Sequence, residues 1–350
     1  MYTGHPSIRN ILPAYGLQQN HFNVVLITSG YIHQTYKLVG RKSFILQRIS
    51  TNVFTEPASI ASNIRIAADY LRSVDPDYFF LTPVKTITGE DMAYDDEGFP
   101  WRLYPYIENS FALGYVGNEE HAFLAAAAFG RLTRKLNGVS ISLFKTVIDR
   151  FHDLSWRWQQ FEQALGTNRR DRLAQAADTI EACRSFRPIV DEYEDLVRSG
   201  KLVLRITHND AKISNVLFDS TTGAAICPID LDTLMPGYFI YDVGDMVRTF
   251  VSPVGEEERD LSYVTVRQDI YDGLIRGYLS EMNDVLTSAE KDAIHFAGRM
   301  MTYIMALRML TDYLNGDVYY VTRYEDQNLV RSKNQVKLLQ ELSREADVPK

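Results

Sequence analysis

The chain has 350 residues, 45% of them hydrophobic and 23% charged, a composition that is typical of folded globular proteins and excludes a disordered or fibrous one. At about 150 residues per domain, this length predicts two domains. The 37 Lys and Arg residues against 45 Asp and Glu residues give a formal net charge of −8. That charge would repel phosphate backbones, which excludes nucleic acid as the main partner.

Cysteine use and hydropathy indicate the compartment. Cys183 and Cys227 form neither a disulfide framework nor a metal-binding spacing, which favours a reducing compartment. The opening MYTGHPSIRN lacks the apolar run of a signal peptide. No run of about 18 apolar residues occurs, because His295, Arg299 and Arg308 interrupt the most apolar segment. We therefore predict a cytoplasmic protein, monomeric or homodimeric, with no membrane partner.

The first part of the chain reads mainly as strands. β-Branched and alternating residues predict three strands over 21–27, 31–39 and 43–49. They also predict a later strand pair, whose first member runs over 79–88 and 92–94 and whose second runs over 101–107. Apolar residues at helical spacing between Ile60 and Leu71 predict one helix, which should end before Pro76. The order β-β-β-α-β-β indicates a small β-rich lobe over residues 1–107.

The rest of the chain reads mainly as helices. Helical periodicity is present over 119–136, 151–177, 180–197, 268–282, 288–314 and 324–346. One β-rich interruption spans residues 202–229. We therefore predict an α+β chain with two lobes, the second being large, mostly helical and extending over residues 108–350.

The most informative segment lies inside that interruption. His208, Asp210 and Asn215 follow the pattern H-x-D-x-x-x-x-N, and the two apolar runs that follow are joined by a turn at 219–223. Such a hairpin would bring Asp230 back beside Asn215. Two carboxylates and a carboxamide suit Mg²⁺, and phosphoryl transfer needs this set together with a carboxylate that accepts the proton of the attacking hydroxyl. Lys212 would offset charge on the transferred phosphoryl group.

Six segments of the chain, in order, resemble the aminoglycoside phosphotransferase and choline kinase group, and most closely its N-acetylhexosamine 1-kinases. They read FILQRI at 44–49, WRLY at 101–104, FHD at 151–153, ITHND at 206–210, IDLDTLMPG at 229–237 and LRMLTDYL at 307–314. The resemblance implies a protein-kinase-like two-lobe fold and an ATP- and Mg²⁺-dependent kinase. It makes Asp210 the catalytic base, which also contacts the acceptor, and Asn215 and Asp230 the metal ligands. It also implies that Asp242 stabilises the catalytic loop.

The same resemblance indicates where the nucleotide would bind. The turn Ser29, Gly30 and Tyr31 lies between two predicted strands, where these kinases place a loop over the phosphates. The hinge, with Tyr106 and Ile107, would offer backbone groups to adenine.

One departure from the kinase pattern concerns the third strand. Protein kinases place there a Lys that pairs with a Glu of the following helix. Here the strand offers Gln47 and Arg48, and the helix between Ile60 and Leu71 offers no Glu. Neighbouring strand residues point to opposite faces, so only one of Gln47 and Arg48 can face the phosphates, and the sequence leaves both open.

For the acceptor we single out Arg308, which lies in an apolar run where a guanidinium needs a partner or a ligand. Its fork of donors suits sugar hydroxyls or an acetamide, although an ion pair with Asp312 or Asp245 is an equal alternative. Tyr313 and His33 are further candidates by the resemblance.

The predicted reaction is phosphorylation of the anomeric hydroxyl of an N-acetylhexosamine, either N-acetylglucosamine or N-acetylgalactosamine. Two alternatives stay open at this point. One is a kinase for another small alcohol, such as an aminoglycoside, choline, homoserine or a different sugar. The other is a non-catalytic nucleotide- or sugar-binding protein, which the missing Lys–Glu pair would favour.

Overall fold

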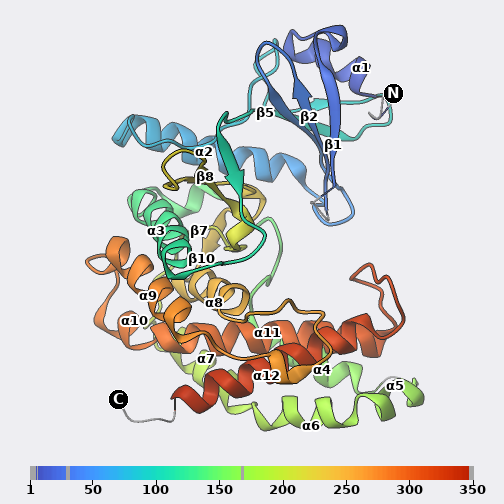
Figure 1. The fold of residues 1–350 in the computed structure, drawn as a ribbon, viewed down its shortest axis with the longest axis vertical. Coiled ribbons are helices and arrows are strands. Elements are labelled where there is room, and N and C mark those ends of the chain that lie inside the picture. The colour runs from blue at the N-terminus through green and yellow to red at the C-terminus, as the bar shows by residue number, and fades with distance from the viewer. Residues whose placement is uncertain (1–4, 6, 29–31, 167–168, 347–350) are drawn as a thin grey trace. The chain divides into compact units, whose positions relative to one another are not determined.

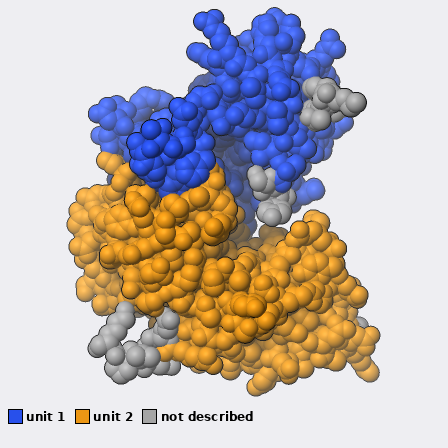
Figure 2. Space-filling model, in the orientation of Figure 1, with its two compact units in different colours: residues 1–111, 138–148, 217–235 blue, residues 112–137, 149–216, 236–350 orange. Residues whose placement is uncertain are grey.

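The computed structural model describes residues 5, 7–28, 32–166 and 169–346. Within them the chain forms two compact units, coloured separately in Figure 2. The first unit comprises residues 1–111, 138–148 and 217–235, and the second comprises residues 112–137, 149–216 and 236–350. Two internal segments therefore belong to the same unit as the N-terminal part of the chain.

The first unit is built on an antiparallel sheet with the strand order β1-β2-β3-β5-β4 (Figure 1). Its strands are β1 (Asn23–Ile27), β2 (Gln34–Val39), β3 (Phe44–Arg48), β4 (Ala93–Tyr94) and β5 (Pro100–Pro105). Leu38, Leu46 and Leu103 occupy one face and are fully buried. Against that face pack the short helix α1 (Ile8–Ile11) and the following 3₁₀ turn η1 (Leu12–Tyr15). Burying this apolar face stabilises the sheet.

Helix α2 (Pro57–Val74) ends before Pro76, as the sequence predicts. It starts with a proline in the first turn, where a missing N–H costs nothing, and it buries Ile60, Ile64 and Leu71 on one side. The prediction of a strand over 79–88 is wrong. The segment makes a single bridge, Val84 to Leu103, because Pro83 offers no N–H to a ladder and residues 86–89 form a turn.

The second unit is mostly helical. Its helices are α3 (Glu119–Lys135), α4 (Leu154–Ala164), α5 (Arg170–Gln175), α6 (Ala177–Ser185), α7 (Pro188–Arg198), α8 (Phe239–Phe250), α9 (Gln268–Met282), α10 (Ser288–Asp292), α11 (Ile294–Asn315) and α12 (Gln327–Ala346). Helix α11 is central, because it packs against α4, α8 and α12 (Figure 1). It is apolar on nearly all sides, as a buried helix must be, and its methionines belong to the core.

Two smaller sheets are also present. Strand β7 (Arg205–Thr207) pairs with β10 (Met235–Gly237), and β6 (Ser110–Ala112), β8 (Val216–Asp219) and β9 (Ala225–Pro228) form a three-stranded sheet. The predicted hairpin after the H-x-D-x-x-x-x-N pattern is present, with its turn closed by the bond from Asp219 N to Ala224 O. Among the helices described, none combines the length and apolar character that a membrane span requires.

Candidate active site

The loop after β7 contains an unusual backbone conformation at Asn209. Asn209 has φ +62°, a left-handed conformation that Asn tolerates better than most residues, and its side chain exchanges hydrogen bonds with Thr207. Gly237 on β10 lies so close that a Cβ there would meet Thr207 Oγ1 at 2.2 Å and Asn209 Oδ1 at 2.5 Å. The loop that carries Asp210 is thus fixed on both sides.

Asp242, in the first turn of α8, anchors this loop from beneath. Its two carboxylate oxygens accept hydrogen bonds from the backbone N–H of His208 at 3.0 Å and of Asn209 at 2.7 Å. The side chain is fully buried. Burial raises the pKa of Asp242 to about 6, and the two backbone donors and His208 oppose that rise.

Asp210 lies at the open side of the loop, with 27% of its side chain exposed. Its Oδ2 is 2.9 Å from Lys212 Nζ and accepts a hydrogen bond of 3.1 Å from Asn215 Nδ2. Burial acts to raise the pKa of Asp210, but the charge and hydrogen bond of Lys212, together with the charges of His208 and Arg248, outweigh it and hold the pKa below its ordinary value. At neutral pH the carboxylate is therefore ionised and can accept a proton.

His152 is a residue of this site that the sequence reading did not place. Its Nε2 lies 2.8 Å from the backbone oxygen of Asn209, so this nitrogen carries the hydrogen. Burial lowers the pKa of His152 to about 3, so the ring is neutral at physiological pH. The FHD motif at 151–153 was a signal, but the partner is a backbone oxygen, which no residue pattern reveals.

In the first unit, Asp230 and Asp232 gather with His33. Ligand atoms of these three side chains lie within 4.8 Å of one another. Asp230 is exposed and has φ +58°. Asp232 is 3% exposed, lies 2.5 Å from His33 Nε2 and forms an ion pair with Arg102 of β5, which is equally buried.

The residues present fit a hard divalent cation. Asp230 supplies an exposed carboxylate, the kind of ligand that Mg²⁺ and Ca²⁺ prefer. In the second unit, Asn215 uses its amide nitrogen for Asp210, and within the described residues its Oδ1 accepts no hydrogen bond. That leaves the amide oxygen available to a cation. Each of the two residues therefore offers an oxygen, and their sharing of one metal stays a prediction.

The third strand turns Gln47 and Arg48 to opposite faces. Gln47 Nε2 donates to Thr35 Oγ1, and Gln47 Oε1 accepts from Arg102 Nε at 3.0 Å, so Gln47 lies on the face of the Arg102–Asp232 pair. Arg48 points the other way, toward Asp95 and Glu97 of the β4–β5 hairpin, with its guanidinium 3.5 Å from the ring centre of Phe99. Of the two, Gln47 is the residue that shares a face with the site.

The other residues predicted to bind the nucleotide belong to the phosphate loop and the hinge. Ser29, Gly30 and Tyr31 lie outside the described residues. At the hinge, the backbone N–H of Tyr106 bonds to Ser43 O at 3.1 Å and the Tyr106 ring lies under Lys37. The backbone oxygen of Ile107 accepts a hydrogen bond from Ser110 Oγ at 2.6 Å. These two groups are engaged within the protein, and the hinge role of both residues stays a prediction.

Arg308 opens into a pocket of about 200 Å³ in the second unit, which is lined by Arg157, Gln160, Arg308, Thr311, Asp312, Asn315, Val318, Tyr319 and Tyr320. Neither alternative partner holds its guanidinium. Asp312 accepts hydrogen bonds from the backbone of residues 318–320 and from Asn328, and Asp245 pairs with Arg248. Tyr313 is buried elsewhere, where its hydroxyl donates to Gln175 at 2.5 Å.

A chain of contacts joins this pocket to the catalytic loop. The Arg308 guanidinium lies 5.3 Å from the ring centre of Phe151, and the Phe151 ring lies 4.1 Å from that of His152. His152 in turn bonds to Asn209, the neighbour of Asp210. Both features belong to the second unit, and these contacts connect the pocket to the loop that carries Asp210.

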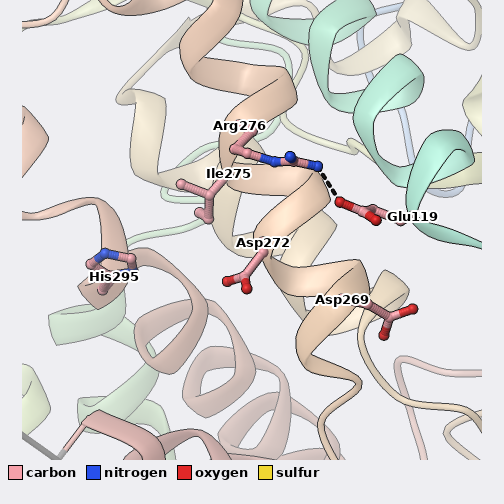
Figure 3. A pocket seen from close by; sticks show the side chains of 6 residues that line it. All are labelled: Glu119, Asp269, Asp272, Ile275, Arg276 and His295. Atoms are coloured by element: carbon pink, nitrogen blue, oxygen red, sulfur yellow. Dashed lines mark hydrogen bonds and ion pairs between the residues drawn. The ribbon is translucent and has the colours of Figure 1, made fainter. Parts of the chain in front are cut away.

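A larger hollow of about 500 Å³ lies on α3, α9 and α11 (Figure 3). Asp269, Asp272 and Arg276 line it from α9, and Arg276 forms an ion pair across it with Glu119. None of its lining residues comes from the catalytic loop. Its position therefore does not connect it to the chemistry of Asp210.

Residues 23–264, more than half of the chain, match the model of the phosphotransferase enzyme family APH. The chain therefore belongs to that family and is a phosphotransferase.

Solved structures agree with the fold. An aminoglycoside phosphotransferase from Alicyclobacillus acidocaldarius is 13% identical, with a TM-score of 0.66 over 99% of this chain and 98% of that one. A microcompartment-associated aminopropanol kinase is 17% identical, with a TM-score of 0.62 over 97% and 96%. A choline/ethanolamine kinase family protein from Mesorhizobium loti is 15% identical, with a TM-score of 0.51 over 92% of both chains. The predicted protein-kinase-like α+β fold is confirmed.

Proposed function

We propose that this enzyme transfers the γ-phosphoryl group of ATP to the anomeric hydroxyl of an N-acetylhexosamine, with Mg²⁺ as the metal. The observation that carries the phosphoryl-transfer part is the ionised, partly exposed Asp210 on a loop held by Asp242. The sugar identity rests on the motifs quoted above and on the guanidinium of Arg308 in a pocket of the same unit.

In this proposal Asp210 is the catalytic base. Its carboxylate takes the proton of the acceptor hydroxyl as the acceptor oxygen bonds to the γ-phosphorus and the bond to the β-phosphate oxygen breaks, which releases ADP. Bound Mg²⁺ would neutralise charge on the phosphates. Asn215 and Asp230 would hold it, and Lys212 would offset charge on the moving phosphoryl group.

The remaining residues that we assign to the nucleotide and acceptor sites belong to the same proposal. The N-terminal lobe, residues 1–107, would bind the nucleotide through Ser29, Gly30, Tyr31, Gln47, Tyr106 and Ile107, and residues 108–350 would carry the catalytic loop and the acceptor site. We omit Arg48, which faces the β4–β5 hairpin, and Tyr313, which bonds to Gln175. His33 is kept as an acceptor contact that Asp232 orients.

A kinase for another small alcohol is the main alternative, because the names of similar structures include an aminopropanol kinase and a choline/ethanolamine kinase family protein. A cationic acceptor would have to bind beside Arg308 and Arg157, and like charges repel. The arrangement of the pocket therefore favours a neutral or anionic acceptor.

The test is ADP release with Mg·ATP across N-acetylglucosamine, N-acetylgalactosamine, glucose, galactose, choline, homoserine and kanamycin. Turnover confined to N-acetylhexosamines, with loss of the reducing end, supports the proposal. Turnover with choline or kanamycin alone overturns the sugar assignment but keeps the mechanism. Nucleotide binding without turnover of any acceptor would instead favour the non-catalytic alternative.

A further inference from the structure

Two arginines, rather than one, line the pocket that contains Arg308. Arg157 comes from α4 and Arg308 from α11, and both line the same hollow of about 200 Å³. The sequence reading singled out Arg308 but gave Arg157 no role, because 151 positions separate them and only the packing of α4 against α11 brings them together.

Neither guanidinium is neutralised by an ion pair with a described residue. Arg157 donates to Gln160 Oε1 at 2.8 Å and to the backbone oxygen of Phe151 at 2.9 Å, and its Nε is buried with no acceptor. Arg308 makes a weak contact of 3.5 Å with Met305 Sδ and otherwise lies near the rings of Phe151, Tyr319 and Tyr320. All these partners are uncharged.

The one carboxylate in the pocket lining serves another purpose. Asp312 is 4% exposed, and four N–H groups donate to it at 2.8 to 3.0 Å: the backbone of Val318, Tyr319 and Tyr320, and the side chain of Asn328. Asp312 therefore holds the loop that forms the pocket wall, and it bonds to neither guanidinium.

The two positive charges are close enough to affect each other. Burial, and after it the charge of Arg308, lowers the pKa of Arg157 to about 10. Two guanidiniums that lie together without a counter-ion are an unfavourable arrangement, because each disfavours the charge of the other. An anion between them would remove this cost, and a carboxylate or phosphate matches the planar fork of each guanidinium.

A purely structural explanation is that Arg157 only connects α4 to the turn at Phe151 by a hydrogen bond, while Arg308 only packs against aromatic rings. Cation–π contacts stabilise a guanidinium, which accounts for Arg308 alone. They do not explain why two guanidiniums that lack a carboxylate partner among the described residues line the same hollow.

We propose that Arg157 and Arg308 together recognise an anionic substituent of the acceptor, so that the preferred substrate is a hexosamine carrying a carboxylate or a phosphate ester. This inference rests on the proposed function, because it takes the pocket to be the acceptor site of a hexosamine kinase. Arg157 acts as the specificity-determining residue, and the hydroxyl that is phosphorylated remains the anomeric one.

The experiment compares kcat/KM for one neutral sugar and three acidic ones at low salt. The neutral sugar is N-acetylglucosamine. The acidic ones are N-acetylmuramic acid, N-acetylglucosaminuronic acid and N-acetylglucosamine 6-phosphate, which differ in the position and kind of anion and so distinguish carboxylate from phosphate recognition. We expect at least one acidic sugar to exceed the neutral one by about tenfold, as a charge-assisted contact implies. Raising the ionic strength should reduce this ratio.

Variants then assign the preference to Arg157. Arg157→Gln should lower the acidic-to-neutral ratio about tenfold, and Arg157→Lys, which keeps the charge but loses the fork, should retain part of it. The ratio does not depend on how much of the variant is folded. Arg198→Gln is the matched control, because Arg198 is 74% exposed on α7 and, within the part of the chain that the structure describes, pairs only with Asp195.

The outcomes separate the two proposals. Turnover of the neutral sugar with no preference for any acidic one overturns the anion inference and leaves the proposed function standing. An unchanged ratio in Arg157→Gln overturns the role of Arg157. If no sugar is turned over, the proposed function fails, and thermal shifts with the acidic sugars decide the rest: no shift overturns the inference, and a shift that Arg157→Gln abolishes supports the anion site.

Discussion

At Asp210, opposing effects act on one carboxylate, and their balance determines what the residue can do. Burial alone would favour the protonated form, which cannot accept a proton. Lys212 Nζ at 2.9 Å, helped by the charges of His208 and Arg248, reverses this preference, and Asn215 adds a hydrogen bond to the same oxygen. The side chain is therefore both positioned and ionised before an acceptor arrives.

Replacement of Asp210 by Asn should lower kcat by about 10²–10⁴-fold, which is the usual contribution of a general base. Asn has nearly the same shape, so nucleotide affinity should change little. Steady-state ADP release and a nucleotide titration measure the two quantities. Asp149→Asn is the control, since Asp149 is 90% exposed, and retained turnover in Asp210→Asn would remove Asp210 from the mechanism.

The pH dependence follows from the lowered pKa of Asp210. A carboxylate with a depressed pKa stays ionised as the pH falls, so the acidic limb of kcat/KM should lie below the ordinary value for Asp, about 3.9, or be hidden by acid unfolding. Lys212→Met leaves the burial and removes the ammonium, so the limb should move to higher pH. A limb that stays in place in Lys212→Met would show that Lys212 does not set this pKa.

At the scale of elements, helix packing in the second unit depends on close backbone approach. Helix α9 presents Gly273 and Gly277 to α3, and a Cβ at Gly277 would meet the backbone oxygen of Phe123 at 2.2 Å. The obstacle is backbone rather than a flexible side chain, so the helices would have to move apart. This explains why glycine, a poor helix former, stands inside α9.

Gly277→Ala should therefore destabilise the protein by about 1–3 kcal/mol, although Ala has the higher helix propensity. Chemical denaturation monitored by circular dichroism measures the change. Gly114→Ala is the matched control, because a Cβ at Gly114 meets nothing within 4 Å. Equal or greater stability in Gly277→Ala would mean that α3 and α9 can separate at little cost.

Local pattern predicted most elements but not all of them. The C-terminal ends of α2 and α7 follow from Pro76 and Gly200, which act within a few residues. The single helix predicted over 180–197 is wrong, because the chain is divided there into α6 and α7, and α7 starts at Pro188. Helix α8 (Phe239–Phe250) was missed, although its residues have a clear helical period. The strand expected over 79–88 failed because its apolar residues suit a ladder that Pro83 prevents.

For the whole molecule, metal and nucleotide binding should appear as added stability. A ligand that binds only the folded state at 100 times its Kd stabilises it by about 2.7 kcal/mol. We expect Mg·ATP to raise the Tm, and Asp230→Asn to lose most of the part that depends on Mg²⁺. Asp149→Asn should respond like the natural protein. A Mg²⁺-dependent shift that survives in Asp230→Asn would exclude Asp230 as a ligand.

The sequence by itself determined the chemistry-bearing loop. His208, Asp210, Asn215 and the hairpin after them lie close together in the chain, and short-range geometry relates them with few alternatives. The overall fold class could be predicted for a similar reason, because the order of strands and helices is a local property that the family match and the solved structures confirm.

Only the tertiary structure decided the partners of the charged residues. From the sequence, Asp312 and Asp245 were equally good candidates for an ion pair with Arg308. In the structure both carboxylates bond to other groups, and Arg157 lines the same pocket as Arg308. Arg102 and Asp232, which are 130 positions apart, form a buried pair that no spacing indicates. The physical reason is that a charge can be satisfied by any group that folding brings within reach, and sequence separation carries no information about that distance.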